Sequence, residues 1–165
     1  MGSSPAGTRM LAPMTNSAPH RELARKALED ICTGKDMSCV AEVYSPRFVD
    51  HVNAMEYHGV EQALESVDIY RAIFSDLRFT LEQTVEQDDH IATRWALHGT
   101  NRGRKIRLTG ITISRIEDGR IAEDYGATDT IELVRQLGAW RTVVLVVTQF
   151  KWLMGLNKRR VAPNA

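Results

Sequence analysis

The sequence has few cysteines and no excess of charge of either sign. Its 21 basic residues are matched by 21 acidic residues, so the formal net charge is +0 at pH 7. A neutral chain has no electrostatic drive toward a polynucleotide, which argues against a nucleic-acid partner. Cys32 and Cys39 form no C-x-x-C motif. We therefore expect reduced, packed thiols in a cytoplasmic protein, in preference to a redox or metal role.

Sequence motifs for metal, nucleotide and nucleophile chemistry are also missing. The five histidines show neither H-x-x-x-H nor H-E-x-x-H spacing. No glycine-rich loop joins a strand to a helix, and no serine lies in a strand–elbow–helix context. We expect no metal ion and no cofactor. Residues 1–19 lack the apolar core of a signal peptide and are rich in Ser, Pro, Ala and Gly, which predicts a disordered leader.

The length of 165 residues favours one domain, which we place at residues 20–138. Its first half carries helical periodicity and its second half alternates with a period of two. The predicted helices are 20–35, a short one between 36 and 45, 59–74 and one that begins near 129; the predicted strands are 47–52, 77–87, 91–101, 105–116 and 120–128. Helices followed by an antiparallel meander predict an α+β fold, with helices packed on one face of a curved sheet.

A C-terminal extension, residues 139–165, follows this domain. Residues 140–156 are strongly apolar and precede the basic run Asn157–Arg160. The stretch is shorter than the ~20 uncharged residues that span a bilayer. A membrane-surface anchor is one interpretation. A lid or a contact with a partner subunit is favoured, because large apolar patches usually mark protein interfaces.

Residues 115–138 (RIEDGRIAEDYGATDTIELVRQLG) carry the most specific pattern. It predicts a strand, a tight Asp118–Gly119 turn, a second strand and a helix capped by Asp129. The pattern resembles the end of the SnoaL-like polyketide cyclases, small proteins with the cone-shaped fold of nuclear transport factor 2. The resemblance implies this fold, a hydrophobic pocket inside the cone, and a homodimer formed through the open sheet face.

The same resemblance places the family's functional positions on this chain. The catalytic aspartate of the cyclases corresponds to Gly126, their histidine to Thr112, and an asparagine on their first strand to Asp50. Limonene epoxide hydrolases share the architecture, and Arg94 resembles the arginine of their aspartate–arginine–aspartate triad. Ala96 and Gly126 stand where both aspartates of that triad would be. The site is therefore rebuilt or lost.

Strand alternation indicates which polar residues accompany these positions, unless a bulge reverses the assignment. With Gly126, Arg94 and Thr112 facing inward, Asp124, His98 and Ser114 follow. The predicted catalytic residues are Asp50, Asp124, His98 and Arg94, and the predicted substrate-binding residues are Asn53, Trp95, Thr112, Ser114 and Gly126. Each has a structural alternative: Arg94 in an ion pair with an aspartate, or His98 as a hydrogen-bonded wall residue.

These residues support proton transfer, because an aspartate in an apolar cone has its pKa raised toward neutrality. The favoured function is a cofactor-free cyclase or isomerase of secondary metabolism that acts on a hydrophobic polyketide- or terpenoid-like intermediate. Two alternatives stay open: a non-catalytic binding or assembly module of the same fold, and an epoxide hydrolase-like enzyme.

Overall fold

The computed structural model describes residues 18–52 and 55–137. Residues 1–17 of the predicted leader, the predicted site residue Asn53, and the whole extension 139–165 lie outside the described residues. Among the residues described, no helix is long and apolar enough to cross a membrane.

The helices match the sequence-based expectations closely. They are α1 (Ala18–Arg25), which continues as the π-helical turn η1 (Lys26–Cys32), α2 (Val40–Val43), α3 (Val60–Ile73) and α4 (Thr130–Leu137). Asp129 caps α4 as predicted, because its carboxylate accepts a hydrogen bond of 2.9 Å from the backbone N–H of Glu132.

Six strands form one sheet in the order β2-β1-β6-β5-β4-β3. Their bounds are β1 (Tyr44–Val52), β2 (Met55–His58), β3 (Arg78–Gln87), β4 (His90–Asn101), β5 (Arg104–Glu117) and β6 (Arg120–Thr128). β1 runs parallel to β6, whereas β1–β2 and the meander from β3 to β6 pair antiparallel. The predicted α+β class is confirmed, but β2 is not among the strands predicted from the sequence.

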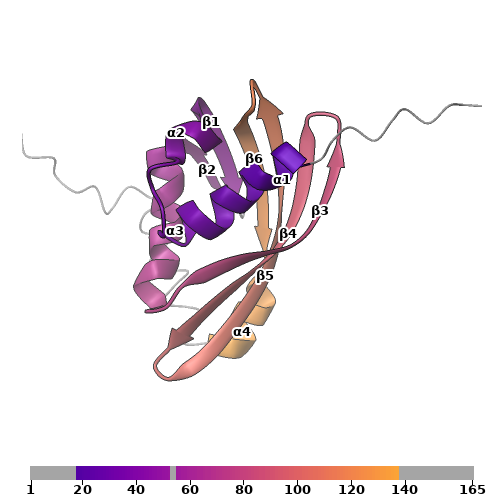
Figure 1. Cartoon of the computed structure of the whole chain (residues 1–165). Coiled ribbons are helices and arrows are strands. Elements are labelled where there is room, and N and C mark those ends of the chain that lie inside the picture. The colour runs from indigo at the N-terminus through magenta and orange to yellow at the C-terminus, as the bar shows by residue number, and fades with distance from the viewer. Residues whose placement is uncertain (1–17, 53–54, 138–165) are drawn as a thin grey trace, which may run out of the picture.

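The sheet curves around α1, η1 and α3, which cover its inner face (Figure 1). α4 lies beside the first residues of β5, where Gln136 is hydrogen-bonded to the backbone of Arg107. The core fills the space between these layers, with fully buried side chains such as Ile31, Ile91 and Ile121. On the outer face Ile111, which is 51% exposed, is one of several apolar side chains that nothing covers within the described part of the chain.

A one-residue irregularity decides which side of β6 faces inward. The register runs from Ile116↔Ile121 to Arg115↔Glu123, so β6 holds one extra residue, Ala122, at this point. Beyond this bulge the side chains of β6 change faces relative to an unbroken ladder. As a result Asp124, rather than Glu123, points toward the helices.

Candidate functional site

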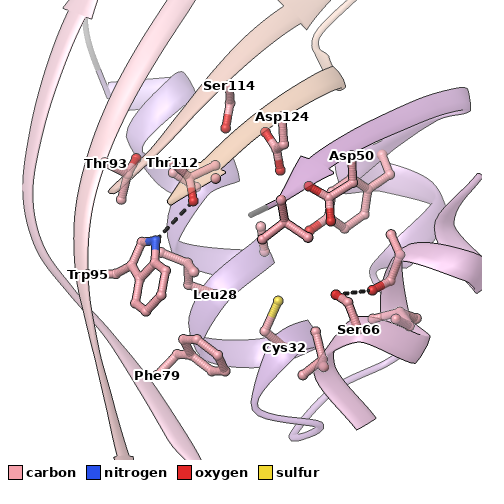
Figure 2. Close-up of a pocket in the computed structure, with 18 of the residues that line it drawn as sticks. Leu28, Cys32, Asp50, Ser66, Phe79, Thr93, Trp95, Thr112, Ser114 and Asp124 are labelled. Atoms are coloured by element: carbon pink, nitrogen blue, oxygen red, sulfur yellow. Dashed lines mark hydrogen bonds between the residues drawn. The ribbon is translucent and has the colours of Figure 1, made fainter. Parts of the chain in front are cut away.

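A cavity of about 110 Å³ lies between the inner face of the sheet and the helices. Its walls are mostly apolar, from α1 and η1 (Ala24, Ala27, Leu28), α3 (Val60, Ala63, Leu64, Val67), β1 (Phe48, Val52) and β3 (Phe79). Its polar lining consists of Cys32, Tyr44, Asp50, Ser66, Tyr70, Thr93, Trp95, Thr112, Ser114, Asp124 and Thr128. Figure 2 shows that most labelled polar groups project from the sheet side of this space.

Asp124 is the most enclosed acid of the cavity, with only 8% of its surface exposed. It lies opposite Ser114 on β5, whose hydroxyl is the hydrogen-bonding group that lowers its pKa. One carboxylate oxygen, Oδ1, is buried without a hydrogen-bond partner. Burial raises the pKa of Asp124 to about 7, and nearby Asp50 adds to the rise while the Ser114 bond opposes it.

Asp50 lies beside Asp124 on the neighbouring strand β1, as its partner in the parallel register. Burial raises its pKa to about 6, although His51 on the same strand opposes the rise. The two acids therefore differ in how strongly they hold a proton. The more deeply buried Asp124 holds its proton to higher pH than Asp50 does.

Trp95 and Thr112 form the opposite wall from Asp50. The indole Nε1–H of Trp95 donates a hydrogen bond of 2.9 Å to the hydroxyl of Thr112 (Figure 2). The indole lies over Gly110, where a Cβ atom would stand only 2.2 Å from the ring. A glycine in the middle of a strand marks such a close approach, so Gly110 creates the place for Trp95.

The prediction that Arg94 and His98 face the cavity is corrected by the structure. Thr112 faces inward, and its register partner on β4 is Thr93, so Arg94 and His98 belong to the outer face. Arg94 is about half exposed and forms a 3.0 Å ion pair with Glu82. His98 lies 3.3 Å from the hydroxyl of Thr80 and lines a separate polar cleft. From there neither side chain reaches a molecule in the cavity.

The other predicted site residues are brought together. Asp50, Trp95, Thr112, Ser114, Asp124 and Gly126 all line the cavity, and their predicted catalytic and binding roles stay predictions. At Gly126 an added Cβ would lie 3.3 Å from Val52 and 3.7 Å from Thr112, so the position has space for a small side chain.

Six polar lining residues were missed as site candidates from the sequence: Cys32, Tyr44, Ser66, Tyr70, Thr93 and Thr128. The hydroxyl of Thr93 is buried, faces the same space and has no hydrogen-bond partner. Cys32, which is a free thiol, lies at the base of the cavity (Figure 2). Burial raises its pKa to about 12, and the charges of Asp124 and Asp50 contribute. The register of β4 with β5 is the signal that would have identified Thr93.

The described residues contain no group of three or more His, Cys, Asp or Glu side chains placed to hold a metal ion. The polar groups that the cavity presents to a bound molecule are carboxyl, hydroxyl, thiol and indole groups. Within that set, Asp50 and Asp124 are the groups that can exchange a proton near neutral pH.

Comparisons with known proteins bear on the fold and the family of the chain. A family model described as SnoaL-like polyketide cyclase matches residues 22–137. No curated protein sequence matches the chain significantly.

Solved structures show the same fold. TsrD from Streptomyces laurentii superposes with a TM-score of 0.65 at 24% identity, over 75% of this chain and 98% of that one. IdmH from Streptomyces antibioticus gives a TM-score of 0.64 at 24% identity, over 73% and 98%. A SnoaL-like protein from Jannaschia sp. CCS1 gives 0.64 at 17% identity, over 80% and 99%. At these identities the likeness establishes the fold, which is the expected cone of nuclear transport factor 2.

Proposed function

This chain belongs to the SnoaL-like polyketide cyclase family, and we propose that it catalyses cofactor-independent ring closure or isomerisation with Asp124 as the acid and Asp50 as the base. The resemblance puts the family's aspartate at position 126, where this chain has glycine. Asp124 lies two residues earlier on the same face of β6. Under this proposal the acid has moved along the strand and has not been lost.

The observation that supports the proposal most strongly is the difference between the two acids. Two carboxyl groups on neighbouring strands line one apolar cavity, and burial brings the pKa of Asp50 to about 6 and that of Asp124 to about 7. Titratable pairs whose environments separate their pKa values are the usual basis of acid and base roles. In this pair Asp124 keeps the proton longer and Asp50 gives it up first.

The chemistry follows from those protonation states. Asp124 gives its proton to an oxygen or an unsaturated carbon of the substrate. If an oxygen is protonated, the C–O bonding pair leaves with that oxygen; in either case a π pair elsewhere in the substrate attacks the electron-deficient carbon and forms the new ring bond. Asp50 then removes a proton from a neighbouring carbon, whose C–H electrons become the new double bond. One proton enters and one leaves, so the reaction needs no oxidant, reductant or water, and exchange between the acids restores the starting state.

The walls define the substrate class. The apolar side chains of α1, α3 and β1 suit a hydrophobic polyketide- or terpenoid-like intermediate. A hydrolase mechanism of the aspartate–arginine–aspartate kind is disfavoured, since Arg94 is bound to Glu82 on the other side of the sheet.

The experiment starts by incubating the protein with extracts rich in such intermediates and identifying the depleted compound and its product by mass spectrometry. Turnover is then compared in Asp124→Asn and Asp50→Asn, with the exposed turn variant Asp88→Asn as the matched control. We expect losses of about 100-fold or more in the first two, the usual contribution of a general acid or base, and no loss in the control. Full turnover in both cavity variants would overturn the acid–base proposal.

The pH dependence gives a second readout. The active form needs Asp50 ionised and Asp124 protonated, so we expect a bell-shaped rate profile with its maximum between about pH 6 and pH 7. A non-catalytic binding module would show neither conversion of a compound into a product nor a bell-shaped pH dependence of the rate.

A further inference from the structure

The charge balance of the cavity is one-sided. Two carboxyl groups line it, whereas none of its lining residues in the described ranges is a lysine, an arginine or a histidine. Such an environment opposes a negative charge on a bound molecule, because no cation is present to compensate for its lost hydration.

Two basic side chains whose charges act on lining residues are engaged elsewhere. Arg71 donates hydrogen bonds to the carbonyl oxygens of Ile31 and Cys32, at 2.9 and 3.1 Å. His51 points away from the cavity, lies 3.0 Å from Glu123, and stacks on the exposed ring of Tyr125 at 4.4 Å. These partners hold both groups outside the space that a ligand would occupy.

Two hydrogen-bond donors of the lining already have acceptors. The indole N–H of Trp95 donates to Thr112, and the hydroxyl of Ser66 donates to the carbonyl oxygen of Ala63. Two buried lining atoms have no hydrogen-bond partner, the carboxylate oxygen Oδ1 of Asp124 and the hydroxyl oxygen of Thr93. A carboxylate oxygen accepts hydrogen bonds and binds cations.

Aromatic side chains reinforce this preference. Tyr44, Phe48, Phe79 and Trp95 all line the cavity. Their rings carry negative charge on their faces and attract a cation that approaches within about 6 Å. Positive charge in this space therefore meets attraction from both the acids and the walls.

We propose that the cavity selects molecules that carry positive charge beside a small ring, and that its reaction passes through a cationic state rather than an enolate. The inference rests on the proposed function, and it adds the charge of the species that the site stabilises. In the reaction, protonation by Asp124 creates the cation, the ring-closing electron pair is drawn to it, and Asp50 takes the proton that neutralises the product.

Stable ammonium ions can represent that state. The cavity of about 110 Å³ is of the order of an engineered cavity of about 150 Å³ that admits benzene, so a one-ring probe is appropriate. Benzylammonium is the cationic probe, benzyl alcohol is its neutral counterpart and benzoate its anionic one. Affinity is measured by calorimetry, and the indole N–H signal of Trp95 identifies binding at this site.

At pH 8 we expect benzylammonium to bind at least ~10-fold more tightly than benzyl alcohol, because a hydrogen bond to a charged acceptor contributes about 1.5–3 kcal/mol, and benzoate not to bind. The preference should shrink as pH falls from about 7 to about 5, since Asp124 and then Asp50 become protonated. Besides burial, His51 acts on the pKa of Asp50, and Ser114 acts on the pKa of Asp124. Cys32 of η1, Tyr44 of β1 and Tyr57 of β2 also face the pair, and the charge of one or both acids raises their pKa values.

Asp124→Asn should reduce the preference for the ammonium, and the exposed-site control Asp88→Asn should preserve it. Equal binding of the alcohol and the ammonium at pH 8, or binding of neither at Trp95, overturns the inference.

The two proposals fail differently. If Asp50→Asn and Asp124→Asn abolish turnover but the alcohol binds as well as the ammonium, the acid–base function stands and the cationic state is wrong. If the ammonium preference is present but both variants turn over normally, the charge selectivity is correct and the acid–base function falls.

Discussion

Asp50 and Asp124 are register partners on the parallel strands β1 and β6, and both line the same cavity. Neighbouring strands lie about 4.8 Å apart, so the two side chains project from closely spaced points of the backbone. Their closeness depends on two features of the fold. β1 must pair with the last strand of the meander, and the bulge at Ala122 must turn Asp124 inward.

A first expectation concerns Gly110, which makes the space for Trp95. In Gly110→Ala the new Cβ would lie 2.2 Å from the indole and 2.7 Å from the carbonyl oxygen of Ala127. The indole must move and its bond to Thr112 must break, so we expect a loss of about 1–3 kcal/mol in the free energy of unfolding. Denaturant titration and the indole N–H signal of Trp95 measure both effects.

Gly126→Ala is the matched control for this variant. It also adds a methyl group to the inner face of the sheet, but the new Cβ meets Val52 at 3.3 Å, a contact that a slight shift relieves. We expect a change below about 1 kcal/mol, and an unchanged Trp95 signal. Equal losses in the two variants would show that Trp95 does not lie over Gly110.

A second expectation compares two threonines that face each other in the register, Thr93 and Thr112. The hydroxyl of Thr93 is buried without a partner, whereas that of Thr112 accepts the indole N–H of Trp95. Replacing a buried, unpartnered hydroxyl with a methyl group removes a desolvation cost, so Thr93→Val should stabilise the fold by about 1 kcal/mol. Thr112→Val should destabilise it by a similar amount, because the indole N–H loses its acceptor.

Thermal or denaturant unfolding of these two variants should therefore move in opposite directions. A destabilised Thr93→Val protein would mean that its hydroxyl has a partner in solution, such as a bound water, and that the cavity is less dry than its walls suggest.

Much of this arrangement could be predicted from the sequence, including one point that we predicted wrongly. The Arg102–Gly103 turn has positive φ at both residues, 48° and 79°, and pairs Asn101 with Arg104. A two-residue hairpin fixes the register of both strands, and counting outward from it pairs Thr112 with Thr93. An inward Thr112 therefore requires an outward Arg94. The prediction that Arg94 faces the cavity depends on its resemblance to an epoxide hydrolase arginine, and the register counted from this turn contradicts it.

The orientation of Asp124 shows where such counting stops. The Asp118–Gly119 turn pairs Glu117 with Arg120, and an unbroken ladder from there would turn Glu123 inward. The bulge at Ala122 reverses this, and nothing in the local sequence marks it. The family resemblance predicted the correct face because it aligned position 126 with a pocket residue. β2 was missed for another reason: a strand of only four residues carries too little periodicity.

A third expectation tests the cap of α4. The carboxylate of Asp129 accepts the backbone N–H of Glu132 at 2.9 Å. Asp129→Ala should destabilise the helix by about 1 kcal/mol, whereas Asp129→Asn should largely preserve it, because asparagine is an equally good N-cap. Hydrogen exchange of the α4 amides reports this locally. Faster exchange in the alanine variant alone supports the cap, and equal exchange in both would contradict it.

The last expectation concerns how the two buried acids change stability with pH. An unfolded aspartate has a pKa near 3.8, and the fold raises that of Asp124 to about 7 and that of Asp50 to about 6. Below about pH 4 both groups are protonated in both states, so they add no pH-dependent cost. As pH rises, the unfolded chain releases these protons first, so the stability contributed by protonated acids is lost progressively until each folded pKa is passed.

Replacing either aspartate with asparagine removes the ionisable group and, with it, the loss of stability that accompanies its ionisation. Relative to the wild type, Asp124→Asn should gain stability from about pH 4 to about pH 7 and then reach a plateau of at most roughly 4 kcal/mol, since each pKa unit corresponds to about 1.4 kcal/mol. Asp50→Asn should reach its plateau near pH 6 and gain less. The gains should not add, because the charge of Asp50 contributes to the raised pKa of Asp124. Denaturant midpoints at pH 4.5 and pH 8 are sufficient, with Asp88→Asn as the exposed control. A difference between Asp124→Asn and wild type that is the same at both pH values would mean that this carboxyl titrates normally, and the assignment of Asp124 as the acid would lose its basis.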